Sequence, residues 1–190
     1  MITRDLDRAR EAYKTGDLEA SRRAHSEASE KHQTGHAQYL KSVVYGGLDG
    51  IITTFAVVAG VAGAALSAST LFILGAANLI ADGLSMGVGD YLSTRAEQEY
   101  AATERKREEW EVEHYPEGEE RELVELYIGK GLSEQDAREL VRTLTRNKKV
   151  WVDVMMVEEL GILESDESPL KNGIATFLSF AAFGAVPLLV

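Results

Sequence analysis

Glutamates that could bind a metal ion gather in a densely charged stretch of the sequence, residues 93–168. Glu104, Glu108 and Glu111 follow the i, i+4, i+7 spacing of one helix face, and Glu119 and Glu122 repeat the i, i+3 spacing. Like charges stacked on one helix face repel each other, and a cation bound among them would offset that repulsion. A solvated charged helix is the ordinary alternative for such a run.

Two adjacent methionines follow in the same stretch. Met155 and Glu159 are four residues apart, and Met156 and Glu159 are three apart, so the thioethers and the carboxylate share a helix face. Mixed oxygen and sulfur ligands favour a divalent first-row ion such as Fe(II) over Ca²⁺, which prefers oxygen alone. The alternative is that both methionines belong to a hydrophobic core with Trp151 and its apolar neighbours.

A second group of candidate metal ligands consists of polar residues and a methionine that lie within long apolar runs. Asp49 lies near the start of the run 42–66, where a carboxylate is costly unless it faces a pathway, a partner or the hydrated membrane edge. A carboxamide, a carboxylate and a thioether share one face of the run 69–92, and this set could form a metal path: Asn78, Asp82 and Met86. For a methionine within a membrane helix, simple packing is the common alternative.

These residues must be positioned by helices, and the sequence predicts an all-α membrane protein. Three apolar runs, 42–66, 69–92 and 172–190, have lengths suited to crossing a bilayer. Buried helices of a soluble protein are the alternative. Basic residues flank the runs on one side, so the positive-inside rule places the N-terminus and the acidic stretch in the cytosol. The predicted division is a polar helical segment 1–40, two membrane helices 41–92, a cytosolic acidic domain 93–168 and a third membrane helix 169–190.

Breaks in the acidic stretch predict three helices, about 93–114, 119–129 and 133–160, the last with a further break near Asn147. Ser133, followed three residues later by Asp136, resembles a capping box at the start of the third helix. In the N-terminal segment, the sequence predicts two short helices on either side of Gly16 and Asp17, with Asp17 as an N-cap.

Composition excludes several classes of function. The 190 residues carry a net charge of -11, which argues against nucleic acid as a partner, and the absence of cysteine excludes a thiolate-bound zinc. No P-loop, catalytic triad or zinc-protease motif is present in the sequence, so we do not expect an enzyme. A ferritin-like site would need paired Glu-x-x-His motifs, and none is found.

Four runs together resemble consecutive parts of the vacuolar iron transporter family over about residues 40–190: YGGLDGIITTFAVVAGVAGA, NLIADGLSMGVGDYLSTRAEQEY, VDVMMVEELGI and SPLKNGIATFLSFAAFGAVPLL. The resemblance implies a homodimer of five-span subunits that moves Fe(II), and often Mn(II), out of the cytosol in exchange for protons. It also implies a cytosolic three-helix metal-binding domain between spans two and three. The sequence itself leaves Co(II) and Zn(II) open as cargo. Because the chain ends where the family's third span ends, we expect no transport by this chain alone.

Residue by residue, the resemblance assigns Asp49 and Met86 to the translocation path. It assigns the metal-binding domain's ligands to Glu108, Glu111, Glu119, Glu122, Met155, Met156 and Glu159. Where the plant-type pattern has a glutamate two turns before the span-two methionine, this sequence has Asn78, and Asp82 could supply the missing charge. Two alternatives remain at this point: a membrane-anchored metal buffer or sensor without transport, and a membrane-tethered interaction protein whose glutamates are plain solvating charge.

Overall fold

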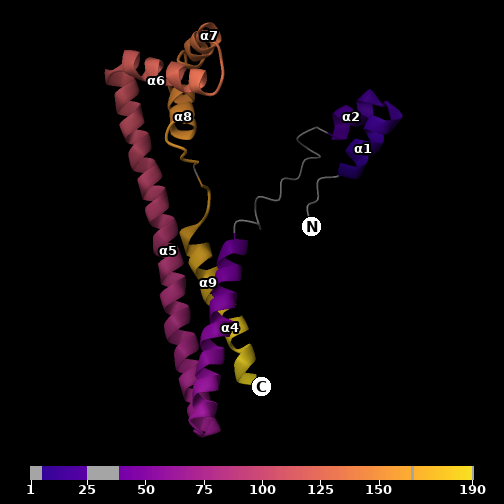
Figure 1. Ribbon diagram of the computed structural model, residues 1–190, viewed down its shortest axis with the longest axis vertical. Helices are drawn as coiled ribbons and strands as arrows, with labels where there is room; N and C mark the ends of the chain where they lie inside the picture. Colours follow the sequence, from indigo (N-terminus) through magenta and orange to yellow (C-terminus); the bar gives the residue numbers. More distant parts are fainter. Residues whose placement is uncertain (1–5, 25–38, 164, 190) are drawn as a thin grey trace. The chain divides into compact units, whose positions relative to one another are not determined.

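The computed structural model describes residues 6–24, 39–163 and 165–189, and all regular structure in these ranges is helical (Figure 1). The predicted all-α class is therefore confirmed. In chain order the elements are α1 (Leu6–Thr15), α2 (Leu18–Ala24), α4 (Leu40–Gly63), α5 (Ala68–His114), α6 (Pro116–Gly129), α7 (Glu134–Leu144), α8 (Lys148–Glu158), α9 (Pro169–Gly184) and the 3-10 turn η1 (Val186–Leu189).

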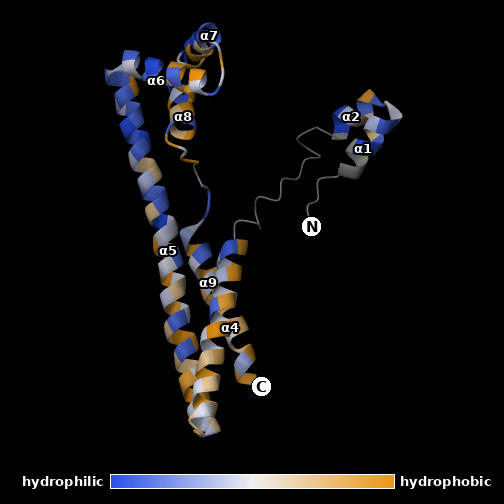
Figure 2. Cartoon of the chain, in the orientation of Figure 1, coloured by the Kyte–Doolittle hydropathy of each residue, from blue (hydrophilic) through white to orange (hydrophobic). Residues whose placement is uncertain are grey.

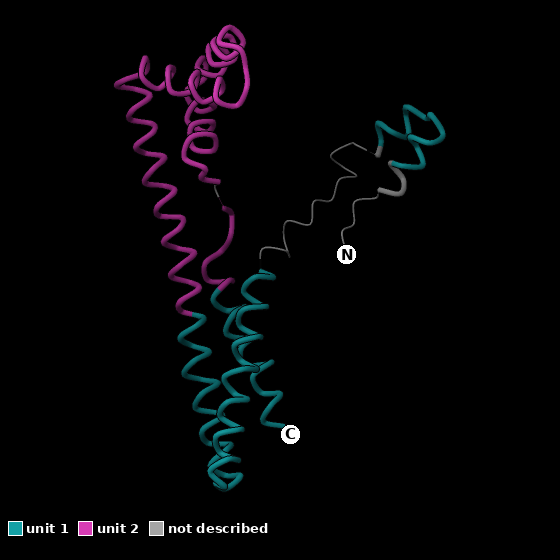
Figure 3. Tube along the Cα trace, in the orientation of Figure 1, with its two compact units in different colours: residues 1–87, 173–190 teal, residues 88–172 magenta. Residues whose placement is uncertain are grey.

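The chain divides into two compact units, which Figure 3 colours separately. Unit 1 comprises residues 1–87 and 173–190, and unit 2 comprises residues 88–172. Unit 1 holds the apolar helices, whereas unit 2 holds the charged stretch with its glutamates and methionines. Much of the predicted 1–40 segment lies outside the described residues.

Three of the described helical segments are long and apolar enough to cross a membrane: Leu40–Gly63, the apolar part of Ala68–His114, and Pro169–Leu189. Figure 2 shows hydrophobic residues along α4, α9 and the first half of α5. Many large apolar side chains on these helices are exposed, Phe55 and Ile73 among them, as expected of surfaces that face lipid. The three predicted spans are confirmed, and the protein is an integral membrane protein.

The second span differs from the prediction in one respect. We expected separate helices over 69–92 and 93–114, but α5 runs from Ala68 to His114 without interruption. The reason is local: the residues around the expected boundary, Tyr91 to Glu97, include neither glycine nor proline, so nothing there breaks the hydrogen-bonded ladder. The apolar run and the first glutamates therefore share one helix.

Small residues allow α4 and α9 to approach closely within unit 1. A Cβ added at Gly46 or Gly50 would clash with the backbone carbonyl of Thr176 or Phe180, respectively. The hydroxyl of Ser179 donates a 2.6 Å hydrogen bond to the carbonyl of Val43 on α4. Glycine contacts and hydroxyl bonds of this kind are how membrane helices associate, because lipid provides no hydrophobic drive between them.

Replacing Gly50 with Val should destabilise unit 1 by about 1–3 kcal/mol, because the new side chain overpacks a contact with the backbone of Phe180. We expect a lower melting temperature in detergent micelles, measured by scanning calorimetry. Gly60, where an added Cβ would meet nothing within 4 Å, is the matched control on the same helix. Equal melting temperatures for Gly50→Val and Gly60→Val would contradict the close packing of α4 and α9.

Unit 2 has its own hydrophobic core, formed by buried residues of α5 to α8: Val112, Leu123, Val124, Ala137, Val141, Trp151, Val152, Met155 and Met156. The predicted third helix is two helices, α7 and α8, and the break falls at Asn147 as the sequence indicated. Ser133 caps α7 by accepting a hydrogen bond from the backbone N–H of Asp136, which confirms the predicted cap.

The two short N-terminal helices are confirmed as α1 and α2. Gly16 between them has a φ of 68°, a left-handed conformation that glycine adopts without strain. The carboxylate of Asp17 then accepts a 2.9 Å hydrogen bond from the backbone N–H of Ala20, as predicted for an N-cap.

Candidate metal centre

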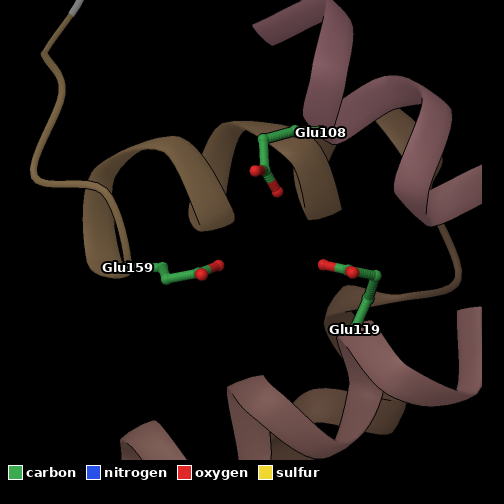
Figure 4. Close-up of side chains that lie close together, drawn as sticks. All are labelled: Glu108, Glu119 and Glu159. Carbon is green, nitrogen blue, oxygen red and sulfur yellow. The ribbon is translucent and has the colours of Figure 1, made fainter. Parts of the chain in front are cut away.

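Three glutamates from three different elements of unit 2 point toward one another (Figure 4). Glu108 comes from α5, Glu119 from α6, and Glu159 directly follows α8. One carboxylate oxygen from each lies within 4.8 Å of the other two. Three oxygens at this spacing can converge on one divalent cation with small side-chain movements, since metal–oxygen bonds are about 2.0–2.6 Å long.

The turn between α5 and α6 brings the first two of these glutamates together. α5 ends at His114, and Pro116 begins α6, where its missing N–H costs no hydrogen bond. Gly118 packs against the ring of Tyr115 so closely that a Cβ would not fit. The chain therefore turns sharply within a few residues, and Glu119 in the first turn of α6 faces Glu108 on α5.

The ends of α8 position the third glutamate. Asn147 begins the helix by accepting hydrogen bonds from the backbone N–H groups of Lys149 at 3.0 Å and Val150 at 3.3 Å. Gly161, with a φ of 66°, lets the chain leave the helix after Glu159. The backbone N–H of Ile162 then bonds the carbonyl of Met156 at 2.8 Å, which secures this end of α8.

Burial makes the carboxylate group electrostatically unfavourable when all its members are charged. Glu108 and Glu119 are only 3% and 5% exposed, and the Oε2 atom of Glu108 has no hydrogen-bond partner among the described residues. Loss of hydration, followed by repulsion from neighbouring carboxylates, raises the pKa of Glu108 and that of Glu119 to about 7. The same causes raise the pKa of Glu159. Such a group requires protons or a bound cation.

The other two predicted carboxylates lie at the edge of this group. The negative charge of Glu111, which is half-buried, raises the pKa of Glu108, Glu119 and Glu159. Glu122 is exposed, and its negative charge raises the pKa of Glu119 and that of Glu159; a hydrogen bond with Glu159 adds a smaller effect in the same direction. Both side chains are near enough to act on the three central carboxylates, but neither belongs to the tight set.

The methionines occupy a different environment from the carboxylates. Met155 and Met156 are 0% and 1% exposed and belong to the hydrophobic core of unit 2, beside Trp151 and Val152. Their packing matches the alternative interpretation, that they are core residues. Their assignment as ligands stays a prediction, because the thioethers lie three and four residues before Glu159 and methionine side chains are flexible.

The residues predicted for the translocation path lie in unit 1. The amide nitrogen of Asn78 is 3.3 Å from the hydroxyl of Thr53 and 3.4 Å from that of Thr54, which joins α5 to α4. Asn78 and Asp82 line an open groove of about 550 Å³ between these helices. Asp49 and Met86, both half-buried, do not line it.

Sequence reasoning missed one charged residue beside the carboxylates. Arg107 is 3.2 Å from Glu111 and 3.7 Å from Glu104, measured between nitrogen and carboxylate oxygen. Its i, i+4 and i, i+3 spacings to these glutamates were visible in the sequence as helix ion pairs. In a stretch so rich in charge, spacing alone does not indicate which pair stands beside a buried group.

Three membrane-spanning segments and a set of three converging carboxylates outside the apolar runs, two of them buried, define a helical integral membrane protein with a candidate metal centre. Comparison with known proteins makes this class specific: the chain matches the VIT family over residues 40–190 and belongs to it. The resemblance to vacuolar iron transporters is thereby confirmed.

Several curated relatives are similar along most of this chain. A vacuolar iron transporter of Toxoplasma gondii is 46% identical over 197 residues, which cover 97% of this chain and 65% of the relative. One from Plasmodium falciparum is 40% identical over 197 residues, covering 99% and 72%, and vacuolar iron transporter 1 of Arabidopsis thaliana is 33% identical over 162 residues, covering 85% and 64%. The chain thus spans only part of each relative's length. Their names are those of transporters, in agreement with the expectation that this protein is not an enzyme.

Proposed function

We propose that this protein takes part in moving Fe(II) out of the cytosol in exchange for protons, and that unit 2 captures the ion before it enters the membrane. The observation that carries the proposal is the group of Glu108, Glu119 and Glu159, of which Glu108 and Glu119 are buried and whose mutual repulsion is relieved by protons or a cation. The names of the relatives favour iron as the cargo. Mn(II), Co(II) and Zn(II) are alternative ions for the same oxygen ligands.

Proton exchange follows from the chemistry of the same carboxylates. A carboxyl group with a pKa near 7 holds its proton for a substantial fraction of the time at neutral pH. A divalent cation binds only the deprotonated form, so each ion bound displaces protons, and each proton taken up weakens metal binding. The two fluxes would be coupled if the ion then passes to Asp49 and Met86 in unit 1.

The proposed orientation and assembly rest on charge and apolar surface. Arg22, Arg23 and Lys41 precede the first span, and the tip between α4 and α5 has no charged residue, which favours a cytosolic unit 2. The exposed apolar faces of the spans are suited to lipid and to further membrane helices, including those of a second subunit in the proposed homodimer.

The methionines provide a test of the ion that unit 2 selects. Replacing Met155 and Met156 together with Leu conserves volume and should cost the core less than about 1.5 kcal/mol each. If the thioethers are ligands, Fe(II) affinity should fall about tenfold or more, while Mg²⁺ affinity should not change. Anaerobic calorimetry on the full chain in detergent measures both. Unchanged Fe(II) affinity would assign both methionines to the core alone.

Transport itself is tested by metal flux. No transport is expected of this chain alone, so the flux measurement uses a form of the protein that has the five spans of the family. Proteoliposomes with an acidic interior should accumulate Fe(II) as protons leave, those without a proton gradient should not, and Asp49→Asn should remove that dependence. Metal binding by unit 2 without any flux would instead favour a membrane-anchored buffer or sensor. Absence of metal binding altogether would favour the membrane-tethered interaction protein.

A further inference from the structure

A positive charge stands at the edge of the candidate metal centre. The guanidinium of Arg107 pairs with Glu111 at 3.2 Å through Nε, and a second nitrogen lies 3.7 Å from Glu104. Its side chain is 64% exposed, so water can replace either partner at little cost. Arg107 therefore holds Glu111 by a bond that is readily exchanged.

The charge of Arg107 reaches the centre itself. It lowers the pKa of Glu108, Glu119 and Glu159, each of which is raised by the surrounding carboxylates. Glu111 acts on the same three carboxylates with the opposite sign. Arg107 and Glu111 thus form a pair whose separation would change the field at all three central residues.

We infer that Arg107 is a displaceable counter-ion. It competes with the metal for Glu111 and so lowers the metal affinity enough for the ion to be released. The inference rests on the metal capture proposed above. A divalent ion among Glu108, Glu119 and Glu159 repels the guanidinium and attracts Glu111. Metal binding must therefore separate Arg107 from Glu111, and release of the metal restores the pair.

A counter-ion of this kind suits a site that has to pass its ion onward. A binding site that holds its ion too tightly cannot release it. Removing the positive charge that competes with the ion for Glu111 would increase the metal affinity further. Arg107 is a positioning residue in this scheme, because it acts on the ion through Glu111 and does not itself bind the metal.

The chain offers a closely matched control for this inference. Arg138 on α7 pairs with Glu134 at 2.8 Å with the same four-residue separation, and its side chain is 62% exposed. Its charge is not among the causes of the shifted pKa values in the carboxylate group. Substituting Arg138 removes one positive charge and one helix ion pair from unit 2 without touching the centre.

The test is Mn(II) titration of the full chain in detergent micelles by calorimetry, comparing Arg107→Gln with Arg138→Gln. We expect Arg107→Gln to bind Mn(II) about three- to tenfold more tightly than the wild type, and Arg138→Gln to stay within about twofold. Arg107→Lys keeps the positive charge but loses the planar guanidinium, so its Mn(II) affinity should lie between that of the wild type and that of Arg107→Gln. In a Glu111→Gln background the gain from Arg107→Gln should disappear.

The direction of the change separates the interpretations. Damage to the fold would weaken binding, whereas loss of a competing counter-ion strengthens it, and circular dichroism of each variant reports whether the helices are retained. Binding by Arg107→Gln that equals or falls below that of Arg138→Gln would overturn the counter-ion role while leaving metal capture intact. A wild-type chain that binds neither Mn(II) nor Fe(II) would instead overturn the proposed metal capture.

Discussion

Replacing Glu108 with Gln should lower the affinity of the chain for Fe(II) or Mn(II) by about 100-fold or more. The substitution keeps the shape of the side chain but removes one of three converging negative charges at a position that is only 3% exposed. A neutral amide oxygen is a far weaker ligand than a carboxylate for a hard divalent ion. Anaerobic calorimetry on the full chain in detergent gives the affinity.

Glu120→Gln is the matched control for this prediction. Glu120 is the immediate neighbour of Glu119 on α6, is exposed, and lies outside the carboxylate group. It should leave metal affinity within about twofold of the wild type, because its charge remains solvated. Equal losses for Glu108→Gln and Glu120→Gln would mean that the acidic stretch attracts cations only through its overall charge, and the candidate metal centre would be wrong.

Glu108→Gln should also raise the thermal stability of the protein in the absence of metal, although it lowers the metal affinity. Glu108 in its charged form places a carboxylate oxygen without a partner in a buried position. Gln carries no charge to repel Glu119 and Glu159, so the metal-free variant should melt at a higher temperature than the metal-free wild type at pH 8. A gain in stability combined with a loss of binding is what a functional site gives and a structural ion pair does not.

Metal affinity should also fall steeply with acid, by about 10- to 100-fold between pH 8 and pH 6. The pKa of Glu108 and that of Glu119 are both about 7, so one or two protons compete with the ion across this interval. Each competing proton changes the apparent affinity by up to about tenfold per pH unit below the pKa. Mn(II) titrations at several pH values, in buffers of different ionisation enthalpy, measure the affinity and the protons released.

The stability of the metal-free protein should fall as pH rises, whereas the metal affinity rises with pH. The pKa values of these two carboxyl groups are raised from 4.5 in the unfolded chain to about 7 in the folded one, so the folded state binds more protons between those values. The associated stability is fully present below pH 4.5 and is lost as pH rises through about 7. Metal-free samples should therefore melt at lower temperature at pH 8 than at pH 6.

The double variant Glu108→Gln/Glu119→Gln is the control for both pH effects, since it removes the two titrating groups. Its melting temperature should change much less between pH 6 and pH 8 than that of the wild type. A wild-type melting temperature that rises over this interval would show that other groups dominate, and the pH argument for proton exchange would fail.

Much of the fold could be predicted because its signals are local. Apolar run length indicated the three spans, and short capping patterns located the starts of α2 and α7 at Asp17 and Ser133. The break at Asn147 was visible for the same reason. The continuity of α5 was missed because a change in composition near residue 92 was taken for a helix boundary, although no residue there ends a helix.

The candidate site was only partly predictable because its geometry is not local. Spacing groups carboxylates that share a helix, such as Glu108 with Glu111, but it does not indicate which faces of different helices meet. The structure brings Glu108 together with Glu119 and Glu159 across three elements, and it leaves Glu122 exposed. Glu159 is exposed as well, so what separates the three from Glu122 is that their carboxylates converge, and this convergence depends on how α5, α6 and α8 pack.

The packing of Met155 and Met156 in the core of unit 2 would make the proposed capture of Fe(II) a hazard to the fold itself. Fe(II) with peroxide generates oxidants that convert a thioether to a sulfoxide, a polar group. At 0% and 1% exposure, either sulfoxide would sit among Trp151, Val152 and Leu123, where it costs packing and hydration together. Oxidative damage would then disassemble the element that presents Glu159.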